Sequence, residues 1–212
     1  MYLHRIPKIA RRLLPSGLWE MEVDEMQPAI YITFDDGPLP EITSFVLEEL
    51  KKYEAQATFF CLGENVEKFP DVYKRIIAEG HSVGNHTYNH PKIKEVSSEQ
   101  YLANVYKAEE SIESNLFRPP YGRLNKKIGN QLIKEGFQIV YWSYLTGDFD
   151  LKLNEKECLE KLIFEAEPGD IIVFHDNEKS FPRMRYVLPR FLNYAQKKSW
   201  AMKSLDFKKR IK

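Results

Sequence analysis

Cysteine is scarce in this chain of 212 residues, which contains only Cys61 and Cys158. The two residues lie far apart and form no CxxC pair, so the sequence predicts neither a zinc knot nor a disulfide framework. Cys61 stands within an apolar run, residues 58–62. We interpret it as a small buried hydrophobic side chain.

A surplus of charge of either sign is also missing. Lys plus Arg and Asp plus Glu both number 31, and the formal net charge is +0. No overall field therefore favours nucleic acid or an anionic membrane, and we expect no nucleic-acid partner. Basic residues cluster at both ends of the chain, where we interpret them as solvated tails.

Long apolar runs are absent too. None approaches the roughly 18 residues of a membrane-spanning helix. The N-terminus carries charge but no uninterrupted apolar stretch and no small-residue cleavage site, so no export signal is visible. We expect a protein without a transmembrane segment, cytoplasmic by default, with action at the cell envelope left open.

Strand-like apolar runs alternate with helix-like segments. Strands are predicted at residues 29–34, 57–62, 81–83, 137–142 and 170–174, with a short extended segment from Phe117 and a final strand at 200–203. Helices are predicted at residues 40–53, 66–79, 97–114, 125–135, 154–166 and 183–198. The alternation indicates βαβ units and a parallel sheet. About seven units in this length predict an α/β fold, a small incomplete barrel in a single domain.

Polar residues gather directly after the predicted strands. The clusters are Asp35 with Asp36, residues 86–90, residues 118–122, residues 148–150, and His175 with Asp176. Active sites of such folds collect beyond the carboxyl ends of the strands. We therefore expect these five loops to converge on one site.

Two adjacent carboxylates, Asp35 and Asp36, follow the first predicted strand within TFDDGP, residues 33–38. Like charges this close repel, so the pair is typical of a cation site or of a tuned acid or base. A solvated turn is the alternative, because Asp, Gly and Pro all favour turns. These six residues by themselves leave both interpretations open.

Two histidines, His86 and His90, lie four residues apart before Pro91. If the segment forms one helical turn, both imidazoles point the same way and can share a metal ion. A pair of structural loop histidines is the alternative. Asp35 or Asp36 could complete a two-histidine, one-carboxylate set, which is typical of catalytic zinc. The other carboxylate would then stand ready to deprotonate a metal-bound water.

Arg118 and His175 each stand at the start of a loop. Arg118 could pair with a carboxylate, and the backbone N–H groups near Tyr121 and Gly122 could face a developing oxyanion. A turn with a surface arginine is the alternative. A lone histidine such as His175 is usually structural, but opposite an activated water it suits the general acid for a leaving amine.

In order and approximate spacing these motifs resemble those of the polysaccharide deacetylases, carbohydrate esterase family 4, which share the chitooligosaccharide deacetylase homology domain. The resemblance rests on residues 33–38, 86–90 and 118–122, on Asp148 and on Phe174-His175. It covers residues 28–204, leaving residues 1–27 as an N-terminal extension and residues 205–212 as a basic C-terminal tail. It implies an irregular (β/α) barrel, a divalent metal that is typically zinc, and removal of acetyl groups from N-acetylglucosamine units of glycans.

The resemblance also implies a role for each site residue. Asp35 would be the catalytic base, tethered by Arg118. Tyr121 would offer its backbone N–H to the oxyanion, and His175 would be the general acid. The metal ligands would be Asp36, His86 and His90.

The fourth motif departs from the family pattern, in which two Asp precede a Trp. Leu145 takes the place of the first Asp and Phe149 that of the Trp. The resemblance then implies that the role of orienting His175 passes to Asp148, or else to Asp150. The fifth motif, usually Leu-x-His, reads VFH.

These residues predict a metal-dependent hydrolase. It would remove acetyl groups from N-acetylglucosamine-type residues of a polysaccharide or peptidoglycan by metal-activated water, with an N-acetylated glycan as its partner. One alternative is a hydrolase of the same fold acting on another non-peptide C–N bond, such as that of a small amide. The other is a glycan-binding member whose altered fourth motif has cost it catalysis.

Overall fold

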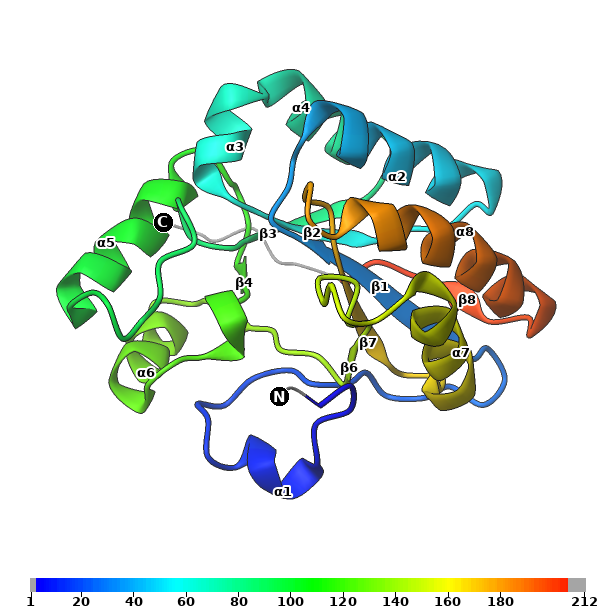
Figure 1. The fold of residues 1–212 in the computed structure, drawn as a ribbon. Coiled ribbons are helices and arrows are strands. Elements are labelled where there is room, and N and C mark those ends of the chain that lie inside the picture. The colour runs from blue at the N-terminus through cyan, green and yellow to red at the C-terminus, as the bar shows by residue number, and fades with distance from the viewer. Residues whose placement is uncertain (1–2, 206–212) are drawn as a thin grey trace.

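Parallel strands form the centre of the computed structural model, which describes residues 3–205 (Figure 1). They hydrogen-bond in the order β5-β4-β3-β2-β1-β7-β6, and β8 pairs with β1. The strands are β1 (Ala29–Asp35), β2 (Thr58–Cys61), β3 (Ser82–Asn85), β4 (Leu116–Phe117), β5 (Gln138–Ile139), β6 (Tyr144–Leu145), β7 (Ile171–His175) and β8 (Ala201–Met202). This confirms the predicted α/β fold, an irregular and incomplete barrel in a single domain.

β1 lies between two other strands of the sheet, and both of its faces are covered. Its side chains are buried at every position except Tyr31, which is half-buried. It pairs in parallel with β2 on one side and with β7 on the other. Near-continuous hydrophobic runs of this kind are typical of parallel strands that are covered on both faces. The strand ends in Asp35, so the first of the two adjacent carboxylates lies at the carboxyl edge of the sheet.

All helices except the first, which lies apart, surround the strands (Figure 1). They are α1 (Lys8–Arg11), α2 (Pro40–Lys52), α3 (Gly63–Lys68), α4 (Pro70–Ala78), α5 (Ser98–Glu109), α6 (Lys126–Lys134), α7 (Glu155–Glu165) and α8 (Phe181–Lys197), with a 3-10 turn η1 (Pro120–Gly122). Reciprocal capping boxes begin α5 at Ser97 and α7 at Asn154. Such caps satisfy backbone N–H groups that the first helical turn leaves without partners.

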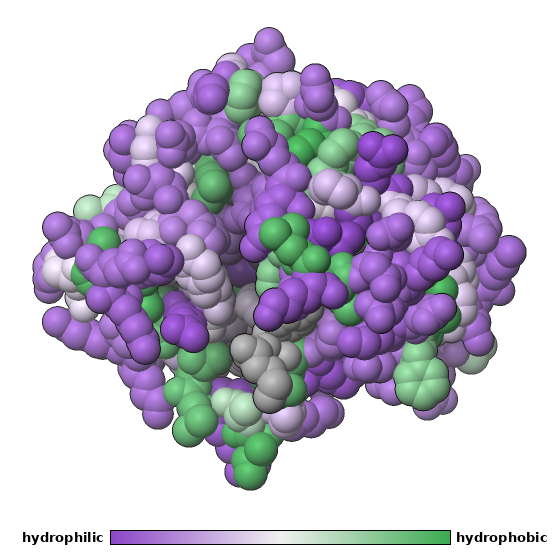
Figure 2. Space-filling model, in the orientation of Figure 1, coloured by the Kyte–Doolittle hydropathy of each residue, from purple (hydrophilic) through white to green (hydrophobic). Residues whose placement is uncertain are grey.

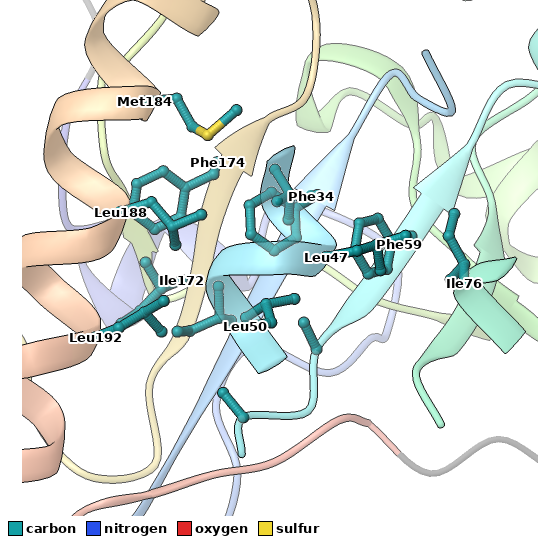
Figure 3. Packing of buried hydrophobic residues seen from close by; sticks show 14 of the residues in the cluster. Phe34, Leu47, Leu50, Phe59, Ile76, Ile172, Phe174, Met184, Leu188 and Leu192 are labelled. Carbon is teal, nitrogen blue, oxygen red and sulfur yellow. The ribbon is translucent and has the colours of Figure 1, made fainter. Parts of the chain in front are cut away.

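The largest hydrophobic cluster lies between the central strands and the helices α2 and α8 (Figure 3). Phe34 of β1 stacks on Phe59 of β2 and on Phe174 of β7, with ring centroids 5.0 and 5.8 Å apart. Leu47 and Leu188 cover these rings from the two helices and are fully buried. Each such side chain contributes about 1.5–3 kcal/mol through burial. The core therefore fixes the strands whose carboxyl ends carry the polar loops.

The helix predicted at residues 66–79 is wrong, because two helices stand there. α3 ends at Lys68 and α4 begins at Pro70, with Phe69 between them in a non-helical conformation. Proline disfavours helical geometry in the residue before it and is suited to the first position of a new helix. Pro70 therefore divides one apparent periodic segment into two.

The strand predicted at residues 137–142 is also wrong, because only β5, Gln138–Ile139, pairs within the sheet. The chain then turns toward a second short strand, β6, which the sequence did not predict. Between them, Tyr141 donates its backbone N–H to Leu18 O rather than to a strand of the sheet. The partner of this stretch is therefore the N-terminal segment.

Residues 3–21, here called the N-terminal segment, join the two edges of the sheet. Arg5 pairs in antiparallel fashion with Tyr144 of β6, and Leu18 pairs in parallel with Val140 beyond β5. Between these contacts the segment carries α1, which lies apart from the other helices (Figure 1). Apolar atoms gather on the surface at this lower edge (Figure 2), where Ile9 is 77% exposed.

Two further findings concern the C-terminal tail and the helices as candidate membrane spans. The predicted basic tail, residues 205–212, lies outside the described residues except for Leu205, whose backbone N–H donates to Thr58 Oγ1. Among residues 3–205, no helix combines the length and the apolar character that a membrane span requires.

Candidate active site

A cleft of about 820 Å³ opens at the carboxyl ends of the strands. Side chains from the predicted loops line it together: Asp35, Asp36, His86, His90, Tyr121 and His175. Arg118 and Asp148 lie beneath them, each with 0% exposure. The polar clusters that follow different strands in the sequence thus meet at one place, as expected for a parallel sheet.

Asp35 is held from below by Arg118. The guanidinium Nη1 donates to Asp35 Oδ1 at 2.7 Å and to Thr33 Oγ1 at 2.7 Å. The rest of the guanidinium is also satisfied, because Nη2 donates to Tyr141 O at 3.0 Å. A buried charge pair of this kind is stable only when its remaining donors find partners. The predicted contact between Arg118 and Asp35 is therefore present and rigid.

Asp36, His86 and His90 bring three potential metal ligands together. Asp36 Oδ1 lies 3.6 Å from His86 Nε2 and 3.5 Å from His90 Nε2. The two histidines do not share a helical turn, because Thr87 and His90 have φ angles of 71° and 58°. These left-handed residues fold the loop back on itself. The imidazoles therefore converge through a tight loop and not through the helical turn that their spacing suggested.

The donor atoms of these three residues fit a divalent cation. His86 Nδ1 donates to Arg118 O at 2.8 Å, so its Nε2 carries the lone pair that faces Asp36. Asp36 Oδ1 is buried and has no hydrogen-bond partner among the described residues. Ligand atoms 2.0–2.2 Å from a tetrahedral zinc lie roughly 3.3–3.6 Å apart. An orphaned carboxylate oxygen at that spacing from two imidazole nitrogens is what a metal site requires.

The protonation states suit metal binding. Burial is the largest cause that lowers the pKa of His90, to about 4, so its imidazole is neutral near pH 7. Burial acts to raise the pKa of Asp36, but His175, His86 and His90 outweigh it and hold this pKa below its ordinary value. Neutral imidazole and ionised carboxylate are the forms that bind metals.

His175 faces this set from β7 and is oriented by Asp148. Asp148 Oδ1 accepts from His175 Nδ1 at 2.8 Å, and Asp148 Oδ2 accepts the backbone N–H of His175 at 2.8 Å. Burial acts to lower the pKa of His175, but the charge and hydrogen bond of Asp148 raise it to about 9. The imidazole is therefore protonated near neutral pH. Asp150 instead accepts the backbone N–H of Lys152, at 2.9 Å.

The loop after Arg118 carries Tyr121, which lines the cleft. Tyr121 has a φ of 59°, and the neighbouring turn bonds run from Gly122 N–H to Pro119 O and from Arg123 N–H to Pro120 O. Neither bond uses the N–H of Tyr121. A Cβ at Gly122 would lie 2.5 Å from the Trp142 ring, so only glycine allows the loop this close to the cleft wall.

Leu145, one of the departures from the family pattern, belongs to the wall of the cleft. Its side chain is buried in a cluster against which Ile6 of the N-terminal segment packs. Its backbone exchanges two hydrogen bonds with His4, at 2.7 and 2.8 Å. An apolar residue is suited to this position because the N-terminal segment covers it. Phe149, the other departure, packs its ring edge-on against His175 at 5.2 Å.

Three residues outside the predicted set of catalytic residues and metal ligands support the site. Asn177 donates to Asp36 Oδ2 at 2.6 Å, and Asn65 donates to the backbone O of Asp36 at 2.7 Å. Asp176 accepts the N–H of Gly37 at 2.9 Å. A signal was available for two of them, because Asp176 and Asn177 directly follow His175. No spacing pattern points to Asn65.

The chain is similar in sequence to known proteins. A family model described as polysaccharide deacetylase matches residues 22–140. A peptidoglycan-N-acetylglucosamine deacetylase of Bacillus cereus is 34% identical over 180 residues, covering 81% of this chain and 84% of the relative. Another of the same name and species is 38% identical over 152 residues, 69% of this chain, but the match spans only 55% of that relative.

A solved structure extends the likeness to three dimensions. The Bc1960 peptidoglycan N-acetylglucosamine deacetylase superposes with a TM-score of 0.83 at 30% identity. The match covers 90% of this chain and 91% of that one. The similarity in fold therefore extends over nearly the whole chain.

Proposed function

The chain belongs to the polysaccharide deacetylase family, carbohydrate esterase family 4, and on this basis we propose that it is a metal-dependent N-deacetylase of acetylated glycans. The N-acetylglucosamine-type residues of a polysaccharide or of peptidoglycan would be its substrates. The printed names of its relatives support this class of substrate. The reaction would hydrolyse a linear amide bond, releasing acetate and a free amine on the sugar.

The metal would be held by Asp36, His86 and His90, and zinc suits a set of two imidazoles and one carboxylate. When bound, a divalent cation supplies a Lewis acid that makes a water more acidic and polarises a carbonyl. The orphaned Asp36 Oδ1 is the feature of the protein that most favours this assignment.

Asp35 would act as the general base. Its Oδ2 lies 4.0 Å from His86 Nε2, so the carboxylate borders the ligand set without being pinned to it. Arg118 occupies the other oxygen, Oδ1, at 2.7 Å. The guanidinium fixes the carboxylate in place, while Oδ2 remains to take a proton from the attacking water.

Two further groups that line the cleft, His175 and Tyr121, would serve the later part of the reaction. His175, with its Nδ1 held by Asp148, has Nε2 left to protonate the departing amine. The backbone N–H of Tyr121 would donate to the oxygen on which negative charge develops. Both groups are held in place before the substrate binds, which is the condition for electrostatic stabilisation of a transition state.

A single observation carries the proposal. An unpartnered buried carboxylate oxygen and two imidazole nitrogens lie within 4.8 Å of one another, in the same cleft as a tethered carboxylate and a carboxylate-bound histidine. A glycan-binding member without catalysis would have no need of the Asp35–Arg118 and Asp148–His175 pairs. We therefore place catalysis ahead of binding alone.

The test is an acetate-release screen on protein stripped with a chelator and reloaded with zinc. The panel would contain acetylated chitooligosaccharides, peptidoglycan fragments and small acetylated amides. Zinc-dependent acetate release from either glycan supports the proposal. Turnover of small amides alone would favour the alternative hydrolase, and glycan affinity without acetate from any substrate would favour the binding member.

A further inference from the structure

The loop after β7 is tied directly to the turn after β1. Asp176 donates its backbone N–H to Asp35 O at 3.0 Å, and its Oδ1 accepts the N–H of Gly37 at 2.9 Å. Its Oδ2 accepts from Thr43 Oγ1 at 2.6 Å. With an exposure of 1%, Asp176 fixes the backbone on both sides of Asp36. The turn and the loop therefore form one rigid unit.

Gly37 shows how closely the turn after β1 packs against the loop after β7. A Cβ at this position would lie 2.0 Å from Asp176 Oδ2, a distance at which atoms overlap. Asn65 adds a further restraint from α3 by donating to the backbone O of Asp36 at 2.7 Å. The main chain of Asp36 thus has little freedom, and only the rotation of its side chain remains to be set.

Asn177 sets that rotation. Its Nδ2 donates to Asp36 Oδ2 at 2.6 Å, and its Oδ1 accepts the N–H of Ser180 at 2.9 Å. Because a carboxylate accepts and an N–H donates, the two contacts together define which end of the amide points at Asp36. One oxygen of Asp36 is therefore occupied, while Oδ1 faces His86 and His90 without a hydrogen bond.

We propose that Asn177 is a positioning residue for the metal site, which aims Asp36 Oδ1 at the place where the cation binds. The inference rests on the proposed metal-binding function. A neutral amide is suited to this task, because it orients the carboxylate without competing for the cation. Residues that hold metal ligands in this way commonly change metal affinity by 10–100-fold when they are removed.

A structural role for Asn177 is the competing explanation, since its Oδ1 also bonds to the residue before α8. Asn177→Ser separates the two roles. A serine hydroxyl can accept an N–H three residues ahead, but it is too short to reach Asp36. The variant thus keeps the start of the helix and loses only the donor to the carboxylate.

The experiment measures the zinc dissociation constant by competition with a chromophoric chelator. We expect Asn177→Ser to raise it about 10–100-fold and to alter the visible absorption of the Co²⁺-loaded protein, which reports ligand geometry. Asn177→Ala should give the same result, and it replaces the serine variant if that protein does not fold. Asn154→Ala removes a helix cap remote from the site, so it should lower thermal stability without changing the zinc constant.

Zinc affinity and a cobalt spectrum equal to those of the unaltered protein would overturn the proposal, even if the melting temperature falls. Failure of the unaltered protein to bind zinc would remove the ligand set and the inference with it. Zinc binding without acetate release would instead count against the proposed function alone. The comparison of variant and unaltered protein would then still decide the role of Asn177.

Discussion

Asp35 and His175 are register partners on the adjacent parallel strands β1 and β7. Partners in such a pair project to the same face of a sheet, so the proposed base and the proposed acid stand side by side. Their separation is set by backbone hydrogen bonds rather than by flexible loops. Replacing either residue should therefore change chemistry with little change in structure.

Asp35→Asn should abolish most of the turnover while leaving the metal in place. Asparagine can still accept from Arg118, but it cannot take a proton from water. We expect kcat to fall by about 10²–10⁴, with metal content unchanged by elemental analysis. Asp71→Asn is the matched control, because Asp71 is an exposed residue of α4. Near-normal deacetylation by Asp35→Asn would contradict the base assignment.

Asp148→Asn should shift the alkaline limb of the pH profile. Burial opposes a high pKa at His175, and the charge and hydrogen bond of Asp148 raise it to about 9. An acid must be protonated to act, so activity declines as pH rises through this value. Without the carboxylate the pKa falls, and the decline in kcat/KM should begin about one to two pH units lower. A profile that keeps its alkaline limb would show that Asp148 does not tune the acid.

Arg118→Met should destabilise the protein strongly. The change leaves the Asp35 carboxylate, 3% exposed, without its charged partner. Breaking a buried pair in this way costs about 3–5 kcal/mol of unfolding free energy, whereas replacing both members costs much less. Denaturant unfolding of Arg118→Met, of Asp35→Leu and of the double variant would measure the coupling. Additive losses in the double variant would mean that the two residues do not act as a pair.

His81 should make stability depend on pH. Its Nδ1 accepts the backbone N–H of Ala57 at 3.2 Å, and burial lowers its pKa from the ordinary 6.5. Below about pH 6.5 the imidazole of His81 takes up a proton more readily in the unfolded state than in the folded state. The free energy of unfolding therefore falls as pH drops through this range. His81→Asn keeps an acceptor and does not titrate. Its loss of stability between about pH 7.5 and pH 5 should be smaller, and an equal loss would exclude His81 as the cause.

Removing a metal ligand should remove the metal. His86→Ala deletes one of the three nitrogen and oxygen donors around the proposed cation and should yield protein with little bound zinc after dialysis. The unaltered protein should retain one zinc per chain and melt at a higher temperature with zinc than without it. His81→Ala is the control for losing a buried histidine elsewhere. Stoichiometric zinc in His86→Ala would argue against the ligand set.

The central part of the fold could be predicted because the local sequence there favours the same helices and strands that the tertiary structure contains. The apolar run of β1 is long enough to identify a buried strand, and Pro40 marks the start of α2. β6 has only two residues, and its length depends on neighbours distant in sequence. Short strands such as this one carry too little periodicity to be recognised.

The site, too, could be predicted only in part. Residue types and spacing identified His86 and His90 and left Asp35 or Asp36 as the third ligand, the resemblance to the family implied Asp36, and the structure brings Asp36 together with the two histidines. The way in which they converge depends on positive φ angles at Thr87 and His90, which no periodicity encodes. Asn177 could not be identified from the sequence because an asparagine in a loop has many ordinary roles. Its importance is visible only once its distance from Asp36 is known.

Protein synthesis completes the N-terminal segment long before it completes the edges with which that segment pairs. His4 and its partner Leu145 are 141 residues apart in the chain. The strand that supports Leu145, β7, is made later still. Contacts this distant form late, because a long loop must close before they are made. The wall of the cleft that carries Ile6 and Pro7 is therefore translated before the strand edges with which the N-terminal segment pairs, and it is set in place after they have formed.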